Sequence, residues 1–295
     1  MKKCLDHPKC VLPQGSLNGP EMPVRLIDIG AGNDAIRLEI YPQREKYIAL
    51  SHLWSTIPLP ETTISNFQQR CRNIPWMALS KTFQEAISLT RGLGIRYLWI
   101  DSLCIIQDST SDWETEARNM SSIYTNSYLT IAATSAADSS EGLLRPRCTN
   151  VQDSNNEEPD FIHEYEIERK SQHDSSSQNY LIFARLQLKY SHECLLAMDY
   201  KVTHAKMAPL LRRAWVLQER LLSPRIMHFC SDELVWECRE GMDCECGFGV
   251  SSSGRAESDS LVVSVLTFSR IHLWGYIIAS GFTGDVEELG QFRAS

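Results

Sequence analysis

The chain has 295 residues, of which 43% are hydrophobic and 22% are charged, and its formal net charge is -8 at pH 7. This composition is globular, with enough length for one large domain or two smaller ones. The net charge is acidic, and the sequence has no Lys/Arg cluster and no zinc-finger spacing. Nucleic-acid-binding proteins usually have a basic surface or such a motif, so we expect no nucleic-acid partner.

No secretory signal follows Met1, because the next residues are polar and rich in Pro, Gly and Cys. We therefore expect a cytoplasmic chain whose 10 cysteines are reduced. The apolar stretch 261–282 is long enough to span a membrane, but Arg270 and His272 lie at its centre. Each charge is costly in hydrocarbon, so we expect no membrane association.

The first elements in chain order are a loose leader over residues 1–22 and two apolar runs, 24–29 and 36–41. The "GAGNDA" between the two runs has good turn chemistry and predicts a hairpin. It lacks a third glycine and a following helix, so it is not a dinucleotide fingerprint.

The central part of the sequence alternates apolar strands with amphipathic helices, which is the pattern of an α/β fold. We expect a mostly parallel sheet flanked by helices, with site residues at the carboxyl ends of its strands. The predicted strands are 47–55, 96–100 and 127–134, and the predicted helices are 62–74, 80–94 and 112–124. Capping boxes of Thr82 with Glu85 and of Ser111 with Glu114 are expected to begin the last two helices.

The polar region 149–179 is predicted to be a surface insertion, and a strand at 180–188 follows it. Residues 210–223 predict a helix with Leu210, Ala214, Leu217 and Leu221 on one stripe. "RIMHF" and "LVWEC" then predict a second hairpin.

A carboxylate falls on the apolar face of the helix predicted at 112–124. At about 100° per residue, Glu116 lands with Trp113 and Met120, whereas Glu114 points toward solvent. Burial there should raise the pKa of Glu116 unless donors satisfy its ionised form. Two interpretations stay open: a structural carboxylate held by an arginine or backbone N–H groups, or a site carboxylate that shares a cleft with Asp101.

Three long motifs resemble the HET domain of fungal heterokaryon-incompatibility proteins from Tyr47 to Glu219. They are "YIALSHLW", "LSKTFQEAISLTRGLGIRYLWIDSLCIIQDSTSDWETEARNMSSIYTNSYLTIAATSAADSSEGLL" and "RRAWVLQERLLSPRIMHF". The resemblance implies a cytosolic module that triggers regulated cell death, in fungal innate immunity, when non-self is sensed. The family usually shows Tyr and Gly where this chain has His52 and Ser55.

HET domains are distantly similar to TIR domains, so the resemblance implies a TIR-like fold with a flavodoxin-like, mostly parallel sheet. Many TIR domains cleave NAD with a glutamate in a Trp-x-x-x-Glu-like setting. For this chain, the similarity implies that Glu116 and Asp101 are the catalytic candidates. It implies NAD as a candidate substrate, and no cofactor is required. Ser51, Trp54 and Trp113 would line the binding site. The alternative is a non-enzymatic signalling module that acts through protein partners or self-association, and whether the chain is an enzyme is left open between the two.

Two other chemistries are considered and not favoured. Cys104 could form a nucleophile with His52, but its surroundings are apolar, as around most inert cysteines. Zinc could be bound by Cys238, Cys244 and Cys246 with His228, but the spacing is weak and we expect no metal. Glu219 and Arg220 are expected to form an ion pair near the main site.

The predicted organisation has three parts. Residues 1–46 are a leader with a hairpin, 47–220 are the HET domain with the insertion 149–179, and 221–295 are an irregular C-terminal extension that resembles a truncated end.

Overall fold

A computed structural model describes residues 4, 7–10, 22–30, 35–54, 59–144, 162–170, 177–185, 195, 208–231, 233–245 and 249–251. The chain divides into two compact units, Met1–Gly249 and Val250–Ser295. The apolar stretch 261–282 lies outside the described residues. Among the residues that are described, no helix combines the length and the apolar character needed to cross a membrane.

A mixed β-sheet forms the centre of the first unit. Eight of its strands lie within this unit, in the order β10-β9-β8-β5-β3-β4-β1-β2. They are β1 (Arg25–Asp28), β2 (Arg37–Ile40), β3 (Tyr47–Ser51), β4 (Tyr97–Trp99), β5 (Leu129–Ala132), β8 (Arg225–Phe229), β9 (Leu234–Cys238) and β10 (Gly241–Cys244). A short strand, β11 (Gly249–Ser251), crosses the boundary between the two units.

The four central strands are parallel, since β3 pairs in parallel with β4 and β5, and β5 with β8. Counted along the chain, β4-β3-β5-β8 is the order 2-1-3-4 of flavodoxin-like sheets, which reverses between β3 and β5. These strands are buried on both faces and therefore consist of near-continuous apolar runs. The predicted α/β fold with a mostly parallel central sheet is confirmed.

Both predicted hairpins are confirmed, and both extend the sheet with antiparallel strands. β1 pairs with β2 and also with β4, and β8 pairs with β9. Strands that precede and follow 47–220 therefore belong to the same sheet as the strands inside it. The three-part division of the chain stays a prediction.

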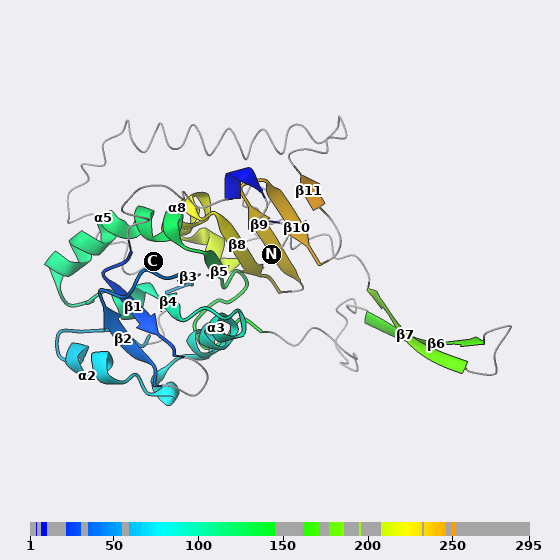
Figure 1. Ribbon diagram of the computed structural model, residues 1–295, viewed down its shortest axis with the longest axis horizontal. Coiled ribbons are helices and arrows are strands. Elements are labelled where there is room, and N and C mark those ends of the chain that lie inside the picture. The colour runs from blue at the N-terminus through cyan, green and yellow to red at the C-terminus, as the bar shows by residue number, and fades with distance from the viewer. Residues whose placement is uncertain are drawn as a thin grey trace. The chain divides into compact units, whose positions relative to one another are not determined.

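The helices cover the two faces of the parallel strands, with α5 and α8 in contact on one face and α3 across the sheet from them (Figure 1). Right-handed crossovers between parallel strands explain this arrangement, because the strand order reverses after α3. The helices and 3-10 turns are η1 (Pro8–Cys10), α2 (Phe67–Arg72), η2 (Trp76–Ala78), α3 (Lys81–Gly92), α4 (Asp101–Cys104), α5 (Thr110–Asn126), η3 (Pro209–Arg212) and α8 (Ala214–Leu222).

The predicted helix caps at Thr82 and Ser111 are wrong by two residues. The Ser80 hydroxyl oxygen accepts from the Phe83 N–H at the start of α3, and that of Ser109 accepts from the Asp112 N–H at the start of α5. In each case an earlier serine competes for the same role, and it can adopt the extended backbone that an N-cap requires.

The region predicted as a surface insertion contains two strands where the structure describes it, and its role as an insertion stays a prediction. β6 (Ile162–Lys170) and β7 (Ser177–Arg185) form an antiparallel hairpin. Glutamates alternate with Tyr165 and Ile167 in "EYEIE", which is a strand period that the polar composition concealed. The predicted strand at 180–188 corresponds to β7, and the rest of 149–179 lies outside the described residues.

The single helix predicted at 210–223 is a 3-10 turn, η3, followed by α8. The tighter turn shifts the phase of the apolar positions, so Val216 and Leu222 are buried. Leu217, predicted on the buried stripe, is 38% exposed. The shift also directs Glu219 into the protein interior.

Candidate functional site

The carboxyl ends of β3 and β4 place polar side chains next to one another. Ser51 ends β3, His52 and Trp54 follow it, and Asp101 begins the short helix α4 directly after the β4 strand. β3 lies at the point where the strand order reverses, which is where open α/β sheets bind ligands. The structure thus brings together three of the predicted site residues: Ser51, Trp54 and Asp101.

Asp101 is the centre of this cluster. One carboxylate oxygen lies 2.8 Å from His52 Nε2, and the other accepts from Trp54 Nε1 at 2.7 Å. The Ser102 N–H also donates to the carboxylate at 2.7 Å, and Arg213 lies 4.0 Å away. Burial alone would raise the pKa of Asp101, but the charge and hydrogen bond of His52, with Arg213 and Trp54, lower it to about 2. Asp101 is therefore a buried, ionised carboxylate at neutral pH.

His52 is held in one orientation by its neighbours. Its ring stacks on Trp54 with 6.4 Å between centroids, and its edge meets Phe83 at 5.0 Å. Nε2 faces Asp101, while Nδ1 is buried and has no hydrogen-bond partner among the described residues. Buried polar atoms are rarely left in this state, and such an atom often marks a site where a proton or a ligand is exchanged.

A second carboxylate, Glu219 of α8, lies against the end of β3. The Ser51 hydroxyl donates to Glu219, and Arg213 donates to the backbone oxygen of His52. Burial raises the pKa of Glu219, while Arg213 and Ser51 act in the opposite direction. Tyr124, from α5, donates to the Leu50 carbonyl at 3.4 Å. Two crossovers of the fold, β4 to β5 and β5 to β8, therefore converge on the end of one strand.

This cluster has the chemical features of a ligand site. The Asp101 and Arg213 side chains are 13% and 20% exposed, so an anion and a cation lie side by side at the edge of the buried region. A guanidinium suits phosphate, an indole ring offers a stacking face, and an ionised carboxylate can bind hydroxyls or stabilise developing positive charge.

Glu116 is placed apart from the contacts of Asp101. The prediction that it is buried is confirmed, since it is 2% exposed, and burial raises its pKa against the effect of Arg25. Arg25 NH2 lies 3.5 Å from Glu116 and 2.6 Å from Asp112. Trp113 is half-buried and packs against the main core. The catalytic role of Glu116 and the binding role of Trp113 stay predictions.

Arg213 was not predicted in this site, Glu219 was expected near it only as a member of an ion pair, and His52 was considered only as a partner of Cys104. All three lie in the quoted motifs "RRAWVLQER" and "YIALSHLW", which were the available signal. The expected ion pair between Glu219 and Arg220 is wrong, because Arg220 pairs instead with Glu237 at 2.7 Å. Neighbouring residues on a helix point about 100° apart and rarely contact each other.

The structure places Cys104 and His228, the residues of the two disfavoured chemistries, in other environments. Burial raises the pKa of the Cys104 thiol to about 12, so it is not a thiolate nucleophile at neutral pH. His228 contacts Thr134 and Glu237, each at 3.0 Å, rather than a group of cysteines. Cys246 of the weak zinc pattern lies outside the described residues.

Comparison with known families now identifies the chain. The family described as Heterokaryon incompatibility protein (HET) matches residues 47–219, which is more than half of the sequence. The chain belongs to the HET family. Searches of curated proteins and of solved structures find no match. HET membership supports a role in heterokaryon incompatibility, and the whole Asp101 cluster, from Ser51 to Glu219, lies within the matched residues.

Proposed function

We propose that this HET protein promotes regulated cell death in response to non-self, and that the cluster around Asp101 cleaves NAD. The observation that carries the proposal is the ionised Asp101 carboxylate beside His52, Trp54 and Arg213, at the carboxyl ends of the parallel strands. These groups match the parts of a dinucleotide: Arg213 would bind phosphate, and Trp54 would stack on a ring.

In this reaction Asp101 would act through electrostatic stabilisation. When water cleaves the nicotinamide–ribose bond, the bonding electron pair leaves with nicotinamide and positive charge develops on the ribose. A buried carboxylate stabilises that charge more strongly than water does. Water then adds to the ribose carbon and releases a proton. The products are ADP-ribose, nicotinamide and a proton.

The resemblance to TIR domains instead favours Glu116 as the catalytic carboxylate. Its contact with Arg25, which Asp112 also binds, supports a structural task for Glu116, because these charges already satisfy one another. We therefore assign the reaction to the Asp101 cluster and keep Glu116 as the competing candidate.

A non-enzymatic assembly module is the second candidate function. It is favoured by apolar side chains on the surface next to α2 and in η2, where Ile64 is 64% exposed and Met77 is 87% exposed. Exposed apolar side chains that form a patch mark contact surfaces for other proteins. In this case death would depend on Met77 and not on Asp101.

The test measures NAD content and viability over time in cells that express the full chain. The variants are Asp101→Asn, Glu116→Gln and Met77→Ser, with Asp243→Asn as an exposed control of the same chemistry. Nicotinamide release by the purified wild-type chain gives a second measurement that does not depend on whether a variant folds. Circular dichroism establishes that each purified variant is folded.

The outcomes separate the candidates. Loss of NAD with wild type, Asp243→Asn and Glu116→Gln, but not with folded Asp101→Asn, supports the proposal. If NAD loss stops only with Glu116→Gln, the catalytic carboxylate is Glu116 of α5 and not Asp101. Death without NAD loss, and without nicotinamide release by the purified chain, overturns the enzymatic proposal and favours assembly.

A further inference from the structure

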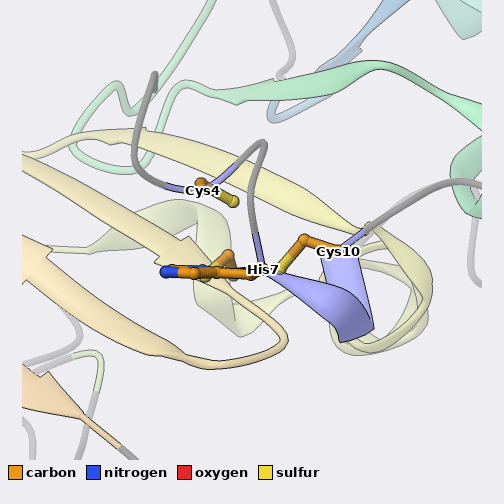
Figure 2. A group of neighbouring side chains, drawn as sticks. Cys4, His7 and Cys10 are labelled. Carbon is orange, nitrogen blue, oxygen red and sulfur yellow. Dashed lines mark hydrogen bonds between the residues drawn. The ribbon is translucent and has the colours of Figure 1, made fainter.

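A cluster of metal-binding side chains shares no residue with the Asp101 site. Cys4, His7, Cys10 and Cys238 each offer one ligand atom, and the four atoms all lie within 4.8 Å of one another. Three come from the N-terminal segment, and the fourth is the last residue of β9. Figure 2 shows Cys4, His7 and Cys10, with the sulfur of Cys10 turned toward His7.

The distances match a tetrahedral centre. His7 Nδ1 lies 3.7 Å from the Cys238 sulfur and 4.0 Å from the Cys10 sulfur. With Zn–S and Zn–N bonds of about 2.3 and 2.0 Å, a tetrahedron separates its sulfur and nitrogen ligands by about 3.5 Å. The two sulfur–nitrogen distances therefore exceed the tetrahedral value by about half an ångström or less, and all four ligand atoms lie within 4.8 Å of one another.

The burial of the cluster also fits a closed structural site. Cys4, Cys10 and Cys238 are between 0% and 7% exposed, and Trp236 packs against them. Structural zinc sites are closed and four-coordinate, and they use sulfur and nitrogen ligands of this kind. Soft thiolates with one imidazole favour zinc over magnesium, calcium or manganese, which prefer oxygen.

The backbone around the ligands is held in place without the metal. The Cys10 N–H donates to the His7 carbonyl at 2.9 Å, which turns the segment so that its ligands converge. The buried Arg225 of β8 donates to the Cys10 carbonyl, and Lys9 pairs with Glu240 at 3.4 Å. The N-terminal segment is therefore anchored to the sheet independently of the four ligands, as expected for a pre-organised site.

We propose that Cys4, His7, Cys10 and Cys238 bind one Zn²⁺ ion that fixes the N-terminal segment to the end of strand β9. His7 binds through Nδ1, and the three cysteines bind as thiolates after releasing their protons. The ion joins residues 231 positions apart in the sequence, which closes a long loop and restricts the unfolded chain. Its role is structural, because all four coordination positions are taken by the protein.

The metal-binding cluster is connected to the Asp101 cluster through β9 and α8. Cys238 follows Glu237, which binds Arg220 of α8 at 2.7 Å, and α8 carries Glu219. Zinc thus stabilises the strand on which one end of α8 is held. Loss of the ion is expected to lower the stability of the whole first unit rather than that of a local loop.

The first test is elemental analysis of the purified full-length chain, expressed with added zinc, with expected content of one zinc ion per chain. Substituting Co²⁺ should give the intense absorption of tetrahedral thiolate coordination. Cys238→Ser and His7→Ala should reduce metal content to background. Cys71→Ser is the matched control, because Cys71 is a half-buried free cysteine of α2 outside the cluster, and it should keep the metal.

A chelator provides a measurement that needs no variant. It should lower the melting temperature of the wild-type chain and of Cys71→Ser, and zinc should restore it. A wild-type chain that contains no zinc and takes up no Co²⁺ overturns the proposal. A disulfide between Cys4 and Cys10 in the chain as purified under reducing conditions, found by mass spectrometry after alkylation, overturns it equally, as does metal retained by Cys238→Ser.

Discussion

Replacing Asp101 by Asn tests whether the charge at the centre of the site stabilises the fold. The substitution keeps the shape of the side chain and removes its charge. The surroundings lower the pKa of Asp101 from 3.8 to about 2. At about 1.36 kcal/mol per pKa unit, ionised Asp101 contributes about 2.5 kcal/mol to the free energy of unfolding at neutral pH. We expect Asp101→Asn to lose about this amount.

The pH dependence provides the sharper test. Because the pKa is lowered on folding, the stabilisation is fully present above about pH 4 and is lost as the pH falls toward 2. Urea unfolding of wild type and Asp101→Asn at neutral pH and at several lower pH values should show a difference that shrinks with acidity. A difference below about 0.5 kcal/mol at neutral pH, or one that does not change with pH, would refute the reasoning.

Three further predictions concern other residues of the same unit. Glu116→Gln should change stability little below about pH 4.5, where Glu116 is protonated, and because burial raises the pKa of Glu116, the variant should gain on wild type as the pH rises above that value. Gly142→Ala should cost more than about 1 kcal/mol in thermal unfolding, since Gly142 has a φ of +84° and a Cβ would lie 2.6 Å from the Glu85 carboxylate. Ser80→Ala should lose about 1 kcal/mol, measured by urea unfolding, because it removes the N-cap of α3.

Matched substitutions distinguish these causes from general damage. Gly94 has a φ of +70°, but a Cβ added there would meet only open space, so Gly94→Ala should cost less than Gly142→Ala, and equal costs would contradict the steric argument. Thr82→Ala should not reproduce the cap loss of Ser80→Ala. A stability of Glu116→Gln that falls relative to wild type as the pH rises would show that Arg25 outweighs burial.

The sequence by itself determined the local elements and the family resemblance. Apolar runs and amphipathic periods depend only on nearby residues, so the α/β alternation, both hairpins and the burial of Glu116 could be predicted. Predictions from the sequence were wrong where neighbouring residues compete for one role, as Ser80 and Thr82 do for the N-cap of α3. They were also wrong where a 3-10 turn shifts the phase of a helix. Each of these outcomes depends on backbone geometry that composition does not specify.

Only the tertiary structure decided which polar residues meet. His52 and Asp101 are 49 residues apart, Ser51 and Glu219 are 168 apart, and His7 and Cys238 are 231 apart. Strand order and crossover direction bring such pairs together, and neither leaves a short-range period in the sequence. Motif spacing therefore favoured Glu116 and found no metal site, whereas the folded chain gathers ionisable groups around Asp101 and four candidate zinc ligands at the end of β9.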